Sequence, residues 1–208
     1  DQKFRVQMCQ IKESYQKMIS SYFMKMGFGI LALTILISVG LTEDFDDMSI
    51  YHLPSKWENQ DGKEVVLSEL KGNVLVVVMI YTSCQAACPI LIGEMKSLEA
   101  QIREKSSGDV KYILVSIDPE QDTPERLKKL SQENKMSGDR WLFLRGTIES
   151  TRDFANLLAV KYTKISPVDF SHSNIISVFD KKGVLIHQQE GLRVDNKATI
   201  DKILELVE

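Results

Sequence analysis

Runs of apolar residues predict the strands of this chain. The clearest is Val74–Ile80, seven apolar residues of which five are β-branched. A continuous run of this kind is typical of a strand that is covered on both faces. Shorter runs predict strands at Val110–Ile117 and Trp141–Leu144, a pair near Leu53–Trp57 and Glu64–Leu67 joined by a turn at residues 59–62, and a second hairpin of Asn174–Phe179 and Val184–Gln188 around residues 180–183.

Helical spacing between these runs predicts the helices. Pro89 suits the first turn of a helix whose apolar stripe comprises Leu91, Met95, Leu98 and Ile102. Thr123 as N-cap and Pro124 at the first helical position predict a helix that ends near Asn134. We expect two more helices, one at Ile148–Tyr162 and one that Asp195 caps, with Ile200, Ile203, Leu204 and Val207 facing inward.

The order of these elements predicts the fold class. Strands alternate with helices and are followed by a hairpin and a last helix, which favours an α/β fold. Right-handed crossovers place the connecting helices on the faces of a parallel sheet. We therefore expect a thioredoxin-like three-layer fold with a central mixed β-sheet, formed by residues 43–208.

A different pattern occupies residues 1–42, which we interpret as a leader. Residues 27–42 are sixteen uncharged, mainly apolar positions, fewer than the ~20 that span a bilayer. The leader carries a net charge of +3, and the acidic run at residues 43–47 follows it. This asymmetry predicts an N-terminal signal or membrane anchor with its start in the cytoplasm and the domain outside. The alternative is a soluble protein with an apolar N-terminal helix.

The charge and composition exclude one class of partner. The net charge is −3, and aromatic residues are not interleaved with Lys or Arg, so no nucleic-acid partner is expected. We also expect a monomer, because no long exposed apolar stripe suggests an obligate partner helix.

The cysteines point to chemistry. Cys9 lies in the leader and is read as incidental, whereas Cys84 and Cys88 follow the strand at Val74–Ile80 and precede a helix. A disulfide between them would close a very small loop and gain little chain entropy, so a structural role is disfavoured. Backbone N–H groups at a helix start stabilise thiolates, so we expect both cysteines to be more acidic than a free thiol. The pair therefore predicts a redox or metal site at the carboxyl end of a central strand.

His172 is the best candidate for a third ligand. It precedes the second hairpin, in a loop at residues 169–173 that a thioredoxin-like fold returns beside the cysteines. Two thiolates and an imidazole suit Cu(I) and Cu(II), whereas structural zinc favours four ligands. We interpret the remaining candidates as structural: His187 as a surface residue, His52 as lacking a partner pattern, Met79 and Met95 as core, Asp118 as a strand end and Asp122 as part of a helix cap.

With these motifs in order, the chain resembles the Sco/SenC family over about residues 50–207. The motifs are Cys84-x-x-x-Cys88-Pro89, the segment Asp118-Pro119-Glu120-Gln121-Asp122-Thr123-Pro124, and His172 ahead of a hairpin. The resemblance implies a membrane-anchored, thioredoxin-like protein whose matching Cys, Cys and His bind copper. Family members assist assembly of the dinuclear copper centre of cytochrome c oxidase, as metallochaperones or as thiol-disulfide reductants of that site.

The chain departs from the family pattern around its ligands. Many members have Pro directly after the first cysteine, an acidic residue within the loop, and Asp before the histidine. This chain has Gln85, Ala86 and Ala87, and Ser171 at the corresponding positions. The ligand set is kept, and the groups that tune the metal differ.

Two functional hypotheses follow. The leading one is a copper metallochaperone, not an enzyme, that uses Cys84, Cys88 and His172 and serves an oxidase subunit or another copper or thiol protein. The alternative is an extracytoplasmic thiol-disulfide oxidoreductase that uses the two cysteines alone. We expect a bacterial periplasmic location at the membrane, with the mitochondrial intermembrane space as the alternative.

Overall fold

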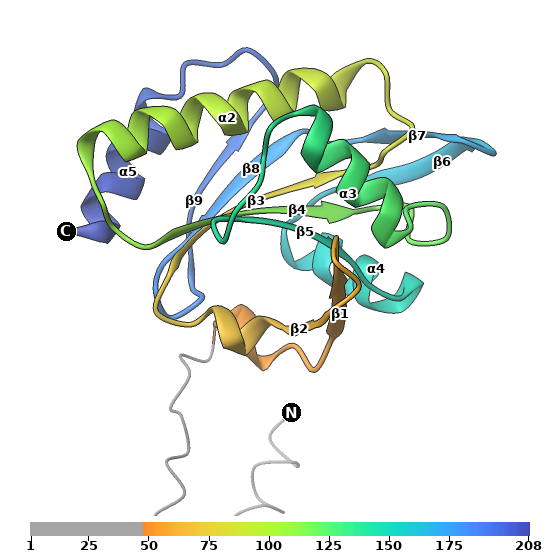
Figure 1. The fold of residues 1–208 in the computed structure, drawn as a ribbon, viewed down its shortest axis with the longest axis horizontal. Coiled ribbons are helices and arrows are strands. Elements are labelled where there is room, and N and C mark those ends of the chain that lie inside the picture. The colour runs from red at the N-terminus through yellow and green to blue at the C-terminus, as the bar shows by residue number, and fades with distance from the viewer. Residues whose placement is uncertain (1–47) are drawn as a thin grey trace, which may run out of the picture. The chain divides into compact units, whose positions relative to one another are not determined.

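The computed structural model describes residues 48–208, which form an α/β domain (Figure 1). The leader at residues 1–42, its apolar segment and Cys9 lie outside the described residues, so the predicted domain boundary stays a prediction. The described strands are β1 Lys56–Asn59, β2 Glu64–Val66, β3 Val74–Ile80, β4 Val110–Ser116, β5 Trp141–Arg145, β6 Tyr162–Ser166, β7 Asp169–His172, β8 Ile175–Phe179 and β9 Leu185–Glu190. The described helices are α2 Ala87–Lys105, α3 Pro124–Glu133, α4 Ile148–Leu157 and α5 Lys197–Val207, with 3₁₀ turns at Ile50–His52 and Leu67–Leu70.

Seven strands form one mixed sheet in the order β2-β1-β5-β4-β3-β8-β9. The three strands β3, β4 and β5 run parallel, and the outer strands on both sides pair antiparallel. All seven side chains of β3 are buried, as its unbroken apolar run predicts. The mixed central sheet expected from the sequence is therefore present.

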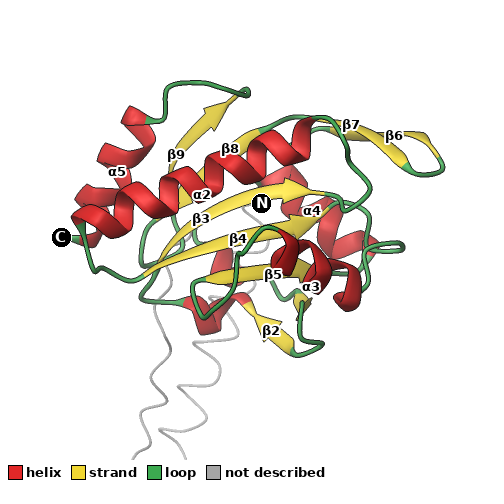
Figure 2. Cartoon of the chain, turned by 45° about the horizontal axis from the view of Figure 1, so that its top comes forward, coloured by secondary structure: helices red, strands yellow, loops and turns green. Residues whose placement is uncertain are grey.

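Helices cover both faces of this sheet. In Figure 2, α2 and α3 lie in front of the strands and α4 lies behind them. Helix α5 packs against α2 and against β9. The predicted stripe of α2, Leu91, Met95, Leu98 and Ile102, is buried, and Thr123 caps α3 by accepting the N–H of Arg126. None of the helices in residues 48–208 is long and apolar enough to cross a membrane.

The second predicted hairpin is confirmed as β8 and β9. Its turn at residues 180–183 ends with Gly183, whose φ of +79° lies in the left-handed region that glycine tolerates best. A Cβ at this position would come within 2.8 Å of Ser49 and Tyr51. The last helix begins at Lys197, two residues after Asp195, whose carboxylate accepts the Lys197 N–H.

The prediction for residues 148–173 was wrong in two respects. Helix α4 ends at Leu157 and does not reach Tyr162, because Ala159 turns the backbone into the left-handed region with a φ of +54°. The residues that follow form the antiparallel β6–β7 hairpin, so His172 ends a strand and does not lie in a loop. In the sequence, the apolar pattern of α4 continues past Leu157. The residue with the positive φ is an alanine and not the glycine that usually ends a helix in this way, so the sequence gives no sign that the helix stops there.

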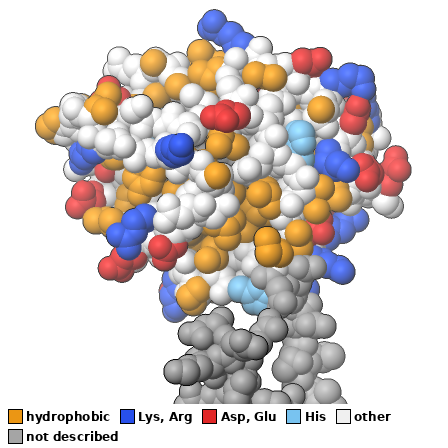
Figure 3. All heavy atoms as spheres, turned by 180° about the vertical axis from the view of Figure 1, so that it is seen from behind, with side chains coloured by type: hydrophobic (Ala, Val, Ile, Leu, Met, Phe, Trp, Pro, Cys, Tyr) orange, Lys and Arg blue, Asp and Glu red, His pale blue; other side chains and the backbone are white. Residues whose placement is uncertain are grey.

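Some large apolar side chains of the described domain are exposed. On the side opposite to the view of Figure 1, apolar side chains gather across the middle of the surface (Figure 3). Two exposed examples are Ile165, near the end of β6, and Val168, in the turn of the β6–β7 hairpin, which are 62% and 60% accessible. The turn of this hairpin is therefore apolar and exposed.

The packing of α4 generates a first prediction. Phe154 is 1% exposed and its ring meets the edge of Trp57 at a centroid distance of 5.3 Å. Replacing Phe154 with Ala should lower the free energy of unfolding by about 3–5 kcal/mol, because a large cavity is left. Leu157→Ala on the same helix is the control, and should cost about 1 kcal/mol because Leu157 is 36% exposed. Urea denaturation of both variants measures the difference, and equal losses would contradict this packing.

Candidate metal centre

The segment from Tyr81 to Cys88, called the cysteine loop below, begins where β3 ends and includes the first two residues of α2. Because β3 and β4 are parallel, both strands deliver their following loops to the same edge of the sheet. Strand β8 runs antiparallel to β3, with Val77 opposite Ser177, so β8 starts at this same edge. His172 lies just before β8. The topology therefore brings two segments together that are 84 residues apart in the chain.

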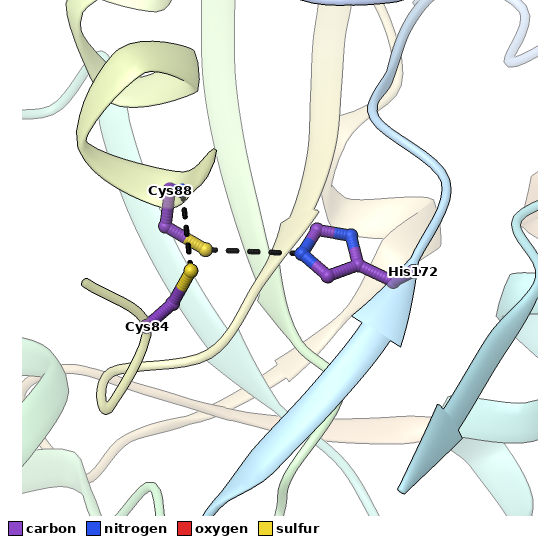
Figure 4. Close-up of side chains that lie close together, drawn as sticks. All are labelled: Cys84, Cys88 and His172. Carbon is purple, nitrogen blue, oxygen red and sulfur yellow. Dashed lines mark hydrogen bonds between the residues drawn. The ribbon is translucent and has the colours of Figure 1, made fainter. Parts of the chain in front are cut away.

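The three candidate ligands lie close together. One atom of each side chain lies within 4.8 Å of the other two: Sγ of Cys84, Sγ of Cys88 and a ring nitrogen of His172. Figure 4 shows the three side chains pointing toward one another. Cys88 Sγ and His172 Nε2 are 3.9 Å apart. Metal–sulfur and metal–nitrogen bonds in proteins are about 2.3 Å and about 2.0 Å long. Atoms this close together can share one ion.

A hydrogen bond orients the imidazole of His172. Its Nδ1 lies 2.9 Å from the carbonyl oxygen of Ser173. A carbonyl oxygen only accepts hydrogen bonds, so Nδ1 carries a proton, and in the neutral imidazole Nε2 keeps its lone pair. That lone pair is on the nitrogen nearest to Cys88, which is the arrangement that metal-binding histidines adopt.

The thiol of Cys84 caps helix α2. No side chain caps this helix at Ala86, and the N–H of Cys88 donates to Cys84 Sγ at 3.3 Å. Burial opposes a thiolate at Cys84, but hydrogen bonds from the Cys88 N–H, the Cys88 thiol and the Ala86 N–H outweigh it. The pKa of Cys84 is therefore lowered. The helix terminus stabilises this sulfur as the sequence suggests.

Cys88 has the opposite environment. Its side chain is 2% exposed, and burial raises its pKa well above the ordinary value of a thiol. The nearby Cys84 thiolate and Asp122 carboxylate raise it further. The expectation that both cysteines are more acidic than a free thiol is thus wrong for Cys88, because only Cys84 receives the helix N–H group while Cys88 is buried.

Asp122 anchors the cysteine loop through hydrogen bonds, a role that the sequence did not suggest. Its carboxylate is fully buried and accepts hydrogen bonds from the N–H of Thr82 at 3.2 Å, the hydroxyl of Thr82 at 2.5 Å and the hydroxyl of Ser116 at 2.6 Å. Asp122 does precede the cap of α3, as predicted. The anchoring contact joins residues 40 positions apart, so no local pattern signals it.

Tyr81 is a second residue that sequence reasoning missed. It is 3% exposed, and its hydroxyl donates to the carboxylate of Asp169. Its ring meets those of Phe170 and His172 edge-on, at centroid distances of 5.3 Å and 5.8 Å. Burial, followed by the hydrogen bond to Asp169, raises the pKa of Tyr81, so this hydroxyl stays protonated.

The other histidines and methionines lie elsewhere. His187 does not stand free on the surface, because its Nε2 lies 3.0 Å from the hydroxyl of the buried Thr199 and joins β9 to α5. Met79 and Met95 are buried core residues, as predicted. His52 lies in the first 3₁₀ turn, within an element separate from the cysteine loop.

Residues 51–208 match the family model described as SCO1/SenC. The SCO1 protein homolog of Bacillus subtilis is 35% identical over 120 residues. That match spans 58% of this chain and 62% of the relative, so less than two thirds of the relative is covered.

Three solved structures have a similar fold. A SCO1/SenC family lipoprotein from Bacillus anthracis is 27% identical with a TM-score of 0.68, covering 74% of this chain and 92% of its own. BsSco, described as having a disulfide switch and as belonging to the Sco family of cytochrome c oxidase assembly proteins, is 28% identical with a TM-score of 0.65, covering 73% and 90%. Arabidopsis thaliana ScoI with copper bound is 22% identical with a TM-score of 0.66, covering 74% and 95%, and supports the fold alone.

The unequal thiols generate a second prediction. Cys84 should react with iodoacetamide faster than Cys88. As the pH is increased, the labelling rate of Cys84 should begin to rise at a lower pH than that of Cys88. The reason is that the thiolate is the nucleophile, and the pKa of Cys84 is lowered while that of Cys88 is raised. Peptide mapping of the reduced full chain after timed labelling at several pH values measures both rates. In urea the two rates should converge. Faster labelling of Cys88 in the folded chain would contradict this arrangement.

Proposed function

The chain belongs to the SCO1/SenC family, and from this membership we propose that it binds copper through Cys84, Cys88 and His172 and passes it to a copper-accepting subunit of a respiratory oxidase. The observation that carries the proposal is the convergence of two sulfurs and one imidazole nitrogen within 4.8 Å at one edge of the sheet. Copper is the cargo of this site.

The donor set suits copper in both oxidation states. Thiolates are soft ligands that select Cu(I), and an imidazole nitrogen also accommodates Cu(II). Structural zinc favours four protein ligands, whereas the ligand group found among the described residues has three. The contact of Nδ1 with the carbonyl of Ser173 leaves Nε2 as the ring nitrogen that the neutral imidazole offers to a metal. Copper is bound in the structure of Arabidopsis thaliana ScoI, a protein of similar fold.

Burial suggests how the cargo is transferred. Cys88 is buried, while Cys84 and His172 are partly exposed at the rim. A ligand of an acceptor protein therefore has access beside Cys84 and His172, and the copper can be taken over one ligand at a time. The acceptor is an oxidase subunit in the leading proposal, or another copper or thiol protein.

The proposed location is the outer side of a bacterial membrane. The support is the charge asymmetry around residues 27–42, which lie outside the described residues, and the lipoprotein nature of the Bacillus anthracis relative. The mitochondrial intermembrane space is the alternative compartment.

A thiol-disulfide oxidoreductase remains the second candidate, and the unequal cysteines favour it. The Cys84 thiolate would attack a substrate disulfide and release one substrate thiolate. Cys88, after losing its proton, would then attack the mixed disulfide and release the second. Two electrons pass to the substrate, and Cys84 and Cys88 end as a disulfide. The disulfide switch named for BsSco is consistent with such a pair.

Oxidation of the pair should abolish copper binding. A sulfur in a disulfide no longer offers a thiolate, so the oxidised chain should bind Cu(I) at least about 100-fold more weakly than the reduced chain. Competition with a chromogenic Cu(I) chelator under anaerobic conditions measures both affinities, and reduction should restore the first value. Equal affinities would place the copper site elsewhere.

Replacing His172 with Ala separates the two functions. Cu(I) retains two thiolates, so its affinity should fall less than about tenfold, whereas Cu(II) prefers nitrogen and oxygen donors and should lose at least about 100-fold. Disulfide exchange should hardly change, because it depends on the thiols. The thiolate-to-Cu(II) charge-transfer absorption and the reduction rate of a model disulfide are the measurements.

His187→Ala is the matched control, since this imidazole contacts Thr199 and not the cysteines. An unchanged copper spectrum with a collapsed exchange rate in His172→Ala would make His172 a proton carrier and remove the chaperone proposal.

A further inference from the structure

The β6–β7 hairpin carries His172 but does not belong to the main sheet. Its two strands pair only with each other among the described strands, and Figures 1 and 2 show them extending beyond the end of β8. At its base the N–H of Ser173 donates to the carbonyl of Lys161 at 2.8 Å. The register of the seven-stranded sheet therefore does not by itself determine where the imidazole of His172 lies.

Tyr81 joins this hairpin to the end of β3. Its hydroxyl donates to the carboxylate of Asp169 and lies 3.4 Å from the N–H of Phe170, which can donate to it. On the other side, the carbonyl of Tyr81 accepts the N–H of Cys84 at 3.2 Å. One residue thus contacts both the segment that carries the cysteines and the segment that carries the histidine.

The two kinds of contact made by Tyr81 differ in how strictly they fix the orientation of the hairpin. Its ring packs against Phe170 and His172, and such edge-on contacts tolerate small rotations. Its hydroxyl makes a charge-assisted hydrogen bond, which is shorter and stronger than a neutral one and needs the donor aimed at the carboxylate oxygen. The hydroxyl, more than the ring, therefore sets the angle of the hairpin relative to the cysteine loop.

We propose that Tyr81 is a positioning residue whose hydroxyl, through Asp169, holds the hairpin so that His172 faces Cys84 and Cys88. The inference rests on the proposed function, because it assigns His172 a role beside the cysteines. Asp169 is three residues before His172 on the short strand β7, so a shift of this anchor is passed to the imidazole through the strand. The hydrogen bond orders the ligand set before any copper arrives.

A thermodynamic cycle tests the proposal with full chains. Tyr81→Phe keeps the ring and removes the hydroxyl, and should weaken Cu(II) binding about tenfold, the size expected when one hydrogen bond to a charged group is lost. In a His172→Ala background the same substitution should change Cu(II) affinity less than about twofold, because no imidazole remains to be positioned. Asp169→Ala should match Tyr81→Phe, and combining the two should add nothing further.

Tyr162→Phe is the matched control. Tyr162 lies on the same hairpin and its ring is tilted against Phe170 at 6.3 Å, while no hydrogen bond of its hydroxyl is found within the described residues. This variant should leave Cu(II) affinity within about twofold of the native value. Urea denaturation of every variant checks that the chain is folded at the temperature of the titration.

A metal-free measurement keeps this proposal separate from the proposed function. In the reduced native chain, proton NMR should detect a nuclear Overhauser effect between the His172 ring and the β-protons of Cys88. This signal should be lost in Tyr81→Phe and kept in Tyr162→Phe. If copper did not bind the native chain, the proposed function would fail while this signal still decided the role of Tyr81.

Two results would overturn the positioning role. One is a Tyr81→Phe chain that keeps the ring-to-Cys88 signal and binds Cu(II) as Tyr162→Phe does. The other is an equal loss of Cu(II) affinity from Tyr81→Phe with and without His172, since an effect that does not need the imidazole is not positioning of it.

Discussion

The burial of β3 is the constraint on which the rest of the domain depends. All seven of its side chains are inaccessible, so both faces must be covered and both edges paired. Parallel β4 and antiparallel β8 supply the edges, while helices supply the faces. A parallel neighbour and an antiparallel neighbour meet at the carboxyl end of β3 in different ways, one ending there and the other starting. The cysteine loop and the histidine segment are brought together by this arrangement.

The environments of the two sulfurs follow from the same edge. Cys84 lies ahead of the first turn of α2 and receives its free N–H groups, whereas Cys88 lies within that turn and faces the core. One thiol is therefore acidic and partly exposed, and the other is buried and weakly acidic. The unequal pair suits stepwise chemistry, whether ligands are exchanged one at a time or a mixed disulfide is resolved. The buried carboxylate of Asp122 accepts hydrogen bonds from Thr82 and so fixes the position of the cysteine loop relative to the sheet.

Local patterns predicted the elements well where burial and periodicity coincide. The run of β3, the stripe of α2 and the cap of α3 each lie within a few residues of their predicted positions. The interval between α4 and β8 was mistaken for a longer helix and a loop. Strand β6 is mostly exposed and shows no regular alternation between a buried and a solvent-facing side, and β7 alternates over only four residues, none of them fully buried. Without that alternation, an exposed hairpin resembles the end of an amphipathic helix.

The candidate site divides along the same line. The sequence by itself determined the identities of Cys84, Cys88 and His172, because two thiols four positions apart at a strand–helix junction are a local signal and copper chemistry then asks for a nitrogen donor. Only the tertiary structure decided which sulfur is acidic, which nitrogen of His172 is free, and which groups hold the segments in place. Those properties depend on burial and on contacts such as Tyr81 with Asp169 and Thr82 with Asp122. The partners in these contacts are 88 and 40 residues apart, and only the packed sheet brings them into range.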